Sequence, residues 1–160
     1  ITPVALLGYS VCKVQKSSIM SDKTRKFWML VGILTLALLF AACQAKTIGQ
    51  QASTDNGSYT VVSVQESQEL LDDKDFTLIN VHTPWQGDIP QTDQHLAYDQ
   101  IEQSLAQLPA EKSTKIVVYC LTSGMAKIAV NSLLGIGYTN VWMLEGGTSA
   151  WEEAGLAIQK

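Results

Sequence analysis

Arginine is nearly absent from this 160-residue chain: Arg25 is the single one, and lysine supplies the other ten basic residues. With 15 acidic residues, the formal net charge is −4. That balance excludes a nucleic-acid-binding protein with a basic footprint over the whole chain. Because Arg25 lies near the N-terminus, the remainder also lacks the guanidinium fork that holds phosphate or carboxylate groups with two hydrogen bonds.

Cysteine is scarce as well, with Cys12, Cys43 and Cys120 far apart in the sequence. Disulfide frameworks and zinc sites both need paired or closely spaced cysteines. The sequence therefore predicts no metal site, and the role of each cysteine has to be considered separately.

Charge is missing altogether from residues 27–43. Three basic residues lie just before this apolar run, and the sequence Ala41-Ala42-Cys43 ends it. A basic segment, an apolar segment and a small-residue end are the three parts of a secretory signal peptide. The end resembles a bacterial lipobox, so we predict that residues 20–42 are a lipoprotein-type signal peptide and that Cys43 carries the lipid.

Two alternatives remain for this segment. An apolar run of 17 residues is at the low end of what spans a bilayer, so it also fits an N-terminal transmembrane anchor. Ordinary cleavage after Ala45 would instead release a soluble secreted protein. All three interpretations place the remainder outside the cytoplasm, and the first two attach it to the cell envelope. Because residue 1 is Ile and the first methionine is Met20, we interpret residues 1–19 as an upstream over-extension.

Residues 43–58 are small and polar without apolar periodicity, and we predict a flexible tether there. From Cys43 onward the chain has six lysines against 14 acidic residues, a net charge of −8. We therefore expect no binding to nucleic acid or to anionic lipid through charge. Contact with a membrane is expected only through the N-terminal anchor.

From residue 59 onward, apolar strands alternate with helices. Strands are predicted at residues 59–62, 76–81, 115–119 and 141–144. Helices are predicted after a capping box that starts at Ser63, at 98–108 with Leu105 inward, at 125–134 with Ile128 inward, and at 148–154. Continuous apolar strands between helices are typical of a parallel sheet covered on both faces. We therefore predict one α/β domain over residues 59–160, with a central, mostly parallel sheet flanked by helices.

Cys120 directly follows the predicted strand 115–119 and opens a short loop before the next helix. Loops at the carboxyl ends of parallel strands are where α/β folds bind ligands. Backbone N–H groups at a helix N-terminus attract anions and favour a thiolate. We predict that Cys120 is catalytic; the alternative is a buried cysteine that acts as a small apolar residue. The predicted substrate-binding loop consists of Leu121, Thr122, Ser123, Gly124 and Met125.

The strand before Cys120, the Cys120 loop and the later stretch Leu144-Glu145-Gly146-Gly147 with Trp151 are together similar to the single-domain rhodaneses. The resemblance covers residues 62–158. It implies the three-layer rhodanese-like fold and a sulfurtransferase that carries sulfur as a Cys120 persulfide, with no cofactor. The related phosphatases have a loop one residue longer and an arginine for phosphate, so phosphatase or arsenate reductase chemistry is not expected here.

Several positions depart from the family's pattern. Leu121 stands where arginine or another polar residue is usual, and Asn80-Val81-His82 replaces an Asp-x-Arg pair that braces the sheet. We expect His82 to take over this structural role through hydrogen bonds; the alternative is a partner of the thiolate. Trp85 is a candidate wall of the active site, and Lys127 is the cation nearest the loop in sequence.

Three functions are compatible with these features. The first is an extracytoplasmic sulfurtransferase that takes sulfur from a small sulfur-containing anion or a persulfide donor and passes it to a thiol acceptor. The second is a binding module that kept the fold without turnover, which the altered loop favours. The third is a thiol redox relay, which needs a resolving cysteine from a partner. We favour the first and expect a monomer.

Overall fold

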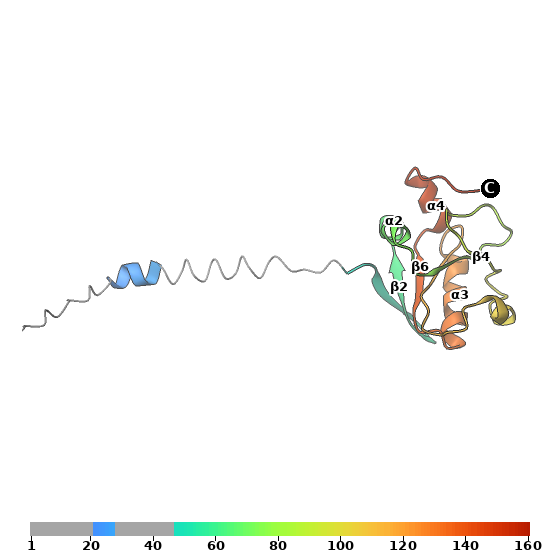
Figure 1. The fold of residues 1–160 in the computed structure, drawn as a ribbon, viewed down its shortest axis with the longest axis horizontal. Helices are drawn as coiled ribbons and strands as arrows, with labels where there is room; N and C mark the ends of the chain where they lie inside the picture. Colours follow the sequence, from blue (N-terminus) through green and yellow to red (C-terminus); the bar gives the residue numbers. More distant parts are fainter. Residues whose placement is uncertain (1–20, 28–46) are drawn as a thin grey trace, which may run out of the picture. The chain divides into compact units, whose positions relative to one another are not determined.

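The computed structural model describes residues 21–27 and 47–160 (Figure 1). In the first segment, residues 22–27 are helical, and Asp22 pairs with Arg25 and Lys26. Most of the predicted signal peptide and its Cys43 lie outside the described residues, so lipidation stays a prediction. Within the two described segments, no helix has both the length and the apolar character needed to cross a bilayer.

Residues Thr47–Lys160 form a compact unit around a six-stranded sheet. Its strands are β1 (Gln50–Thr54), β2 (Gly57–Val62), β3 (Thr77–Asn80), β4 (Gln94–His95), β5 (Ile116–Tyr119) and β6 (Val141–Leu144). Their order across the sheet is β1-β2-β6-β5-β3-β4; β1 and β2 pair antiparallel, and the other neighbours pair parallel. The structure thus confirms the predicted α/β domain with a mostly parallel sheet.

Helices lie on both faces of this sheet (Figure 1). They are α2 (Val64–Asp72), the 3-10 helix η1 (Glu102–Gln107), α3 (Gly124–Gly135) and α4 (Gly147–Glu153). The predicted capping box is present: the Ser63 hydroxyl accepts a hydrogen bond from the Glu66 N–H, and the Glu66 carboxylate accepts one from the Ser63 N–H. Side chains of β5 alternate between the two faces, so Val118 and Cys120 join the apolar cluster under α3. Tyr119 joins the cluster under α2 and α4.

Two of the predicted helices need correction. The segment 98–108 forms only the 3-10 helix η1, and Leu105 in it is 51% exposed. The chain before η1 is instead held against β3, where the Leu96 N–H donates to the Asn80 carbonyl. In α3, Ile128 is also 51% exposed. The buried residues of α3 recur every three or four positions and leave Ile128 on the opposite, exposed face of the helix. These buried residues are Ala126, Ala129, Val130, Leu133 and Leu134.

The flexible tether predicted at residues 43–58 is wrong from Thr47 onward. β1 pairs with β2 from Gln50 opposite Val61 to Thr54 opposite Gly57, and the two strands form a hairpin. Residues 55–56 make its turn. Asp and Asn are common in tight turns, and Gly57 directly after them has φ +146, a conformation that favours glycine. This local turn chemistry outweighs the polar composition of the segment. The domain therefore begins near Thr47 rather than at residue 59.

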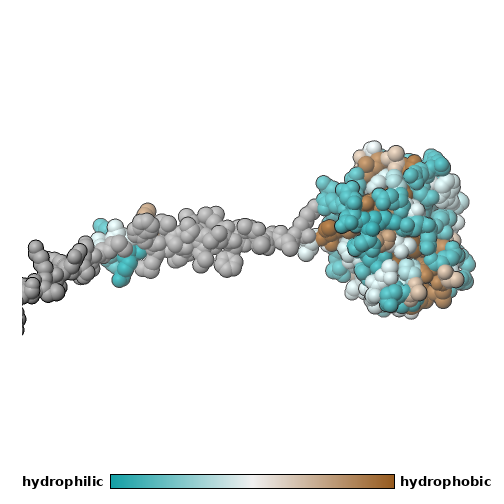
Figure 2. All heavy atoms as spheres, in the orientation of Figure 1, coloured by the Kyte–Doolittle hydropathy of each residue, from teal (hydrophilic) through white to brown (hydrophobic). Residues whose placement is uncertain are grey.

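The surface of this unit is mostly hydrophilic on the side drawn in Figure 2, with small hydrophobic areas between. Within residues 47–160, the large apolar side chains that are exposed are Trp85, Leu105 and Ile128. Of these, Trp85 lies beside the candidate site.

Candidate active site

Cys120 lies at the carboxyl end of β5, which sits between β6 and β3 in the sheet. It is the one cysteine of residues 47–160; its thiol is free, and the residue is 1% exposed. Residues 121–123 form a loop of bends, and α3 begins directly after it at Gly124. Along the chain, Cys120 therefore lies between a central strand and a helix N-terminus, as the sequence predicts, and its side chain belongs to the buried apolar cluster under α3. Its role as a nucleophile stays a prediction.

The N-terminus of α3 points unpaired N–H groups toward this loop. The first bond within the helix runs from the Lys127 N–H to the Ser123 carbonyl at 3.0 Å. The N–H groups of the first three helical residues therefore have no partner inside the helix. The Ser123 side chain does not cap them, because its hydroxyl accepts a hydrogen bond from the Gly146 N–H at 2.9 Å. Such a helix end favours an anionic sulfur.

The start of α4 holds the Cys120 loop in place. The Thr148 N–H donates to the Cys120 carbonyl at 2.9 Å, and the Ser149 N–H donates to the Leu121 carbonyl at 2.9 Å. Gly147 has φ +56, a conformation that glycine adopts without steric cost, and a Cβ there would overlap the Cys120 carbonyl oxygen. Gly147 thus allows α4 to approach the Cys120 loop closely.

An open cavity of about 440 Å³ lies beside the loop. Its walls come from the turn after β3, the Cys120 loop, α4 and the C-terminal segment. The lining residues are Trp85, Gln86, Leu121, Thr148, Glu152, Ile158 and Lys160. Cys120 is not part of the lining, but its neighbour Leu121 is. A cavity of this size suits a small-molecule ligand.

Of Trp85 and Lys127, the two side chains predicted near the site, only Trp85 lines the cavity. The indole Nε1 of Trp85 donates to Asp88 Oδ2 at 2.8 Å. Lys127 is exposed on α3 and does not line the cavity. The lysine that lines the cavity is Lys160. The residue before it, Gln159, makes two backbone hydrogen bonds with Asp88, of 2.8 and 2.7 Å, and these hold the C-terminal segment at the cavity. A single bridge between distant residues leaves no pattern in the sequence, so Lys160 is not predictable from it.

Asn80 provides the bracing that the sequence pattern assigns to His82. Its Nδ2 donates to the Gly87 carbonyl at 3.0 Å and to Asp88 Oδ1 at 2.9 Å, and its Oδ1 accepts from the His82 N–H at 2.9 Å. One amide side chain therefore fixes both ends of the turn that carries Trp85.

The expectation that the His82 side chain is hydrogen-bonded is wrong. His82 is 8% exposed, and neither ring nitrogen has a partner among the residues that the structure describes. Burial, and next the nearby His95, lower the pKa of His82. The hydrogen bonds that brace this turn come from the Asn80 amide instead.

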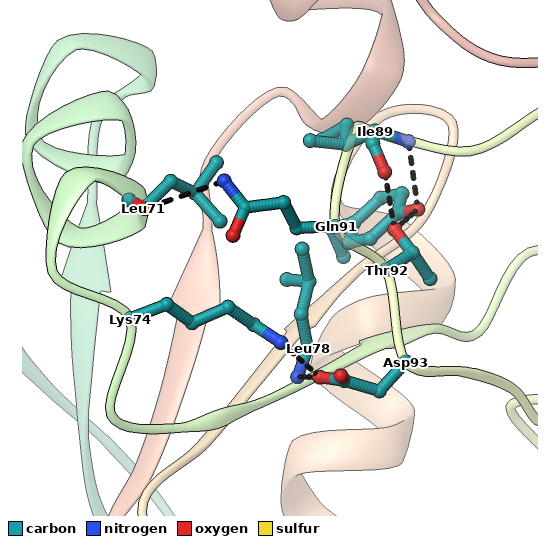
Figure 3. Close-up of polar contacts among 8 residues, drawn as sticks. Leu71, Lys74, Leu78, Ile89, Gln91, Thr92 and Asp93 are labelled. Carbon is teal, nitrogen blue, oxygen red and sulfur yellow. Dashed lines mark hydrogen bonds and ion pairs between the residues drawn. The ribbon is translucent and has the colours of Figure 1, made fainter.

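Tyr119, directly before Cys120, holds the far side of the same turn. Its hydroxyl accepts from the Ile89 N–H at 3.0 Å and shares a hydrogen bond of 2.7 Å with Thr92 Oγ1. Burial raises the pKa of Tyr119. Figure 3 shows Ile89 and Thr92 with the neighbouring Asp93, whose carboxylate accepts from the Leu78 N–H at 2.7 Å. The turn is thus tied to β3 and β5, the two strands that lead into the site.

Metal ligands do not gather at this site or elsewhere in the two described segments. No three His, Cys, Asp or Glu side chains within residues 21–27 and 47–160 lie close enough together to hold a metal ion.

Solved structures of rhodanese-like proteins have a similar fold. A rhodanese-like domain from an Anabaena protein is 26% identical, with a TM-score of 0.53, over 61% of this chain and 76% of that one. A rhodanese-related protein from Thermoplasma volcanium is 23% identical, with a TM-score of 0.53, over 62% of this chain and 97% of the other.

A third similar structure has a different description. This protein from Rhodopseudomonas palustris, described as a possible tyrosine phosphatase, is 20% identical with a TM-score of 0.53, over 63% and 85% of the two chains. The shared fold therefore does not by itself decide the reaction. The model of the rhodanese-like domain family matches residues 63–154, from the cap of α2 to the end of α4. This chain belongs to the rhodanese-like domain family.

Proposed function

We propose that this protein is an extracytoplasmic sulfurtransferase that carries sulfane sulfur as a persulfide on Cys120. The observation that supports it most is the position of Cys120, between the end of β5 and the unpaired N–H groups of α3. The cavity lined by Leu121, the residue after Cys120, supports it too, because a donor and an acceptor both need space near the Cys120 loop. The basic and apolar segments before Cys43 support a lipid-anchored location in the cell envelope.

The reaction has two steps. In the first, the Cys120 thiolate attacks the sulfane sulfur of the donor, the donor's S–S bond breaks, and sulfite or a thiolate leaves with the electron pair. Cys120 then holds the sulfur as a persulfide anion, which the N–H groups of α3 stabilise. In the second step, an acceptor thiolate attacks the outer sulfur, the persulfide S–S bond breaks, and Cys120 leaves as a thiolate. The acceptor gains the sulfur, and the enzyme returns to its starting state.

Mass spectrometry after incubation with thiosulfate or a polysulfide tests this proposal. We expect one added sulfur atom on the peptide that contains Cys120, and its loss on treatment with cyanide or a thiol. The Cys120→Ser variant should show no such addition at this peptide. The absence of labile sulfur on Cys120 with every donor would overturn sulfur transfer.

A second candidate is a binding module without turnover. The 1% exposure of Cys120 favours it, because a donor cannot reach a fully covered sulfur unless the loop moves. The same experiment distinguishes the two, since a binding module acquires no persulfide.

A further inference from the structure

The cavity beside Leu121 contains one acidic and one basic side chain, Glu152 and Lys160. Its other polar side chains, Thr148 and Gln86, are neutral, so the lining has a formal charge of zero. The surrounding domain is strongly acidic, with five lysines against 14 acidic residues in residues 47–160. The cavity therefore differs from the rest of the domain: its lining has one charge of each sign, whereas the domain has an excess of negative charge.

Glu152 is held by the same helix that supports the Cys120 loop. It lies four residues after Thr148 in α4, so the two side chains share one face of the helix. Thr148 is 5% exposed, and its N–H donates to the Cys120 carbonyl. Glu152 therefore extends from the same side of α4 as the residue that holds the Cys120 loop, and its side chain is exposed at the cavity.

Lys160 belongs to the C-terminal segment, which forms another wall of the cavity and is held in place by hydrogen bonds. The preceding Gln159 makes two backbone hydrogen bonds with Asp88. The chain packs so closely here that a Cβ on Gly87 would lie 2.9 Å from the Gln159 carbonyl oxygen. The aromatic wall between these segments is Trp85, whose indole is fixed on the carboxylate of the same Asp88.

We propose that this cavity binds a small zwitterionic thiol or its persulfide, with an ammonium group at Glu152, a carboxylate at Lys160 and the sulfur at the Leu121 end. This inference rests on the proposed sulfur transfer and names its substrate class. A volume of about 440 Å³ is far more than the five heavy atoms of thiosulfate need. Glu152 repels that dianion, whereas an amino-acid-like ligand matches both charges.

Binding of an unreactive probe to the full-length Cys120→Ser variant separates recognition from sulfur transfer. The probe is S-methyl-L-cysteine, compared by calorimetry with 3-(methylthio)propionate, which lacks the ammonium, and 2-(methylthio)ethylamine, which lacks the carboxylate. We expect the zwitterion to bind about tenfold more tightly than either analogue, as one additional charge-assisted hydrogen bond predicts.

Charge-removing variants then assign the two contacts. Glu152→Gln should abolish the advantage that the ammonium gives, and Lys160→Gln should abolish that of the carboxylate. Glu153→Gln and Lys127→Gln are the matched controls, because they remove the same charges from exposed positions that do not line the cavity. All four are changes of exposed side chains, which usually leave stability nearly unchanged.

The outcomes are distinct for the two proposals. Equal affinity for the three probes would overturn the zwitterion site, whatever the wild-type Cys120 does with sulfur donors. An equal loss of affinity in the control variants would also overturn it, because long-range charge would then be the cause. Charge-selective binding without labile sulfur on wild-type Cys120 would overturn sulfur transfer and leave a module that binds zwitterions.

Discussion

Gly147 packs directly against the carbonyl group of Cys120, and no side chain fits between them. A Cβ on Gly147 would lie 2.8 Å from the Cys120 carbonyl carbon and would overlap its oxygen. The contact joins the first residue of α4 to the strand end that carries the thiol. The position of the candidate nucleophile therefore depends on a residue far away in the sequence.

Gly147→Ala should destabilise the domain and displace the loop. The left-handed backbone of φ +56 costs a non-glycine residue about 1–2 kcal/mol, and the overlap with Cys120 adds about 1–3 kcal/mol. Gly155→Ala is the matched control, since Gly155 has φ +79 but a Cβ there would meet no atom within 4 Å. Urea unfolding of both variants measures the difference; equal losses would show that the contact with Cys120 does not matter.

Tyr119→Phe should also lower stability, by about 1–3 kcal/mol, because the buried Ile89 N–H loses its acceptor. Tyr59→Phe provides a control: Tyr59 is 7% exposed, and its hydroxyl has no hydrogen bond within the described segments. We expect the control to change the free energy of unfolding by less than half as much. Similar effects in the two variants would mean that the hydroxyl of Tyr119 does not hold the turn.

The local parts of the fold are predictable because their signals lie within single segments. The apolar runs that form β5 and β6 and the capping box at Ser63 each specify their own structure. These local signals also predict that Cys120 lies between a buried strand and a helix start, but not the contact with Gly147 that holds it there. The β1–β2 hairpin shows that composition alone can mislead: the polar residues of this segment suggest a tether, whereas the Asp55-Asn56 turn followed by Gly57 forms a hairpin.

The cavity is not predictable in the same way. Lys160 enters it only through the pairing of Gln159 with Asp88, and Glu152 only through the docking of α4 on the Cys120 loop. Sequence distance instead favours Lys127, which does not line the cavity. Likewise, the bracing role belongs to Asn80 rather than His82, because the geometry of the turn, and not the residue type, decides which side chain reaches the Gly87 carbonyl.

His82→Phe should stabilise the domain at neutral pH, since it replaces two buried, unpartnered nitrogens with an apolar ring; a gain of about 1 kcal/mol is expected. It should also change the pH dependence. The pKa of His82 is lowered in the folded state, so the unfolded chain binds the extra proton first, and stability falls as the pH drops through about 6.5. Unfolding at several pH values should show a flatter profile for His82→Phe, whereas His95→Gln should retain most of the slope.

Cys43→Ser tests the predicted anchor. If Cys43 carries the lipid, the variant should lose lipidation and be released from membranes or be found in the wrong compartment. Mass spectrometry of the N-terminus from the wild-type membrane fraction is the measurement. An intact N-terminus without lipid would contradict lipidation and favour an uncleaved anchor.

Leu121 predicts poor use of thiosulfate by the wild-type protein. The donor is a dianion, and its capture benefits from a cation next to the nucleophile, whereas Leu121 presents an apolar side chain to the cavity. The acidic domain also provides no long-range attraction. We expect weak thiosulfate:cyanide sulfurtransferase activity, with a high KM as the main defect.

Leu121→Arg should then raise kcat/KM for thiosulfate by about tenfold or more, because a charge-assisted contact contributes about 1.5–3 kcal/mol. The gain should shrink as salt rises, since Leu121 is only half-buried and the new contact would be screened. Leu121→Met is the control for side-chain length without charge. In the double variant Leu121→Arg, Glu152→Gln, the gain should be larger, because Glu152 lines the same cavity and attracts the guanidinium away from the donor. Wild-type activity equal to that of an arginine-bearing rhodanese, or no effect of the new arginine, would show that the N–H groups of α3 capture thiosulfate unaided.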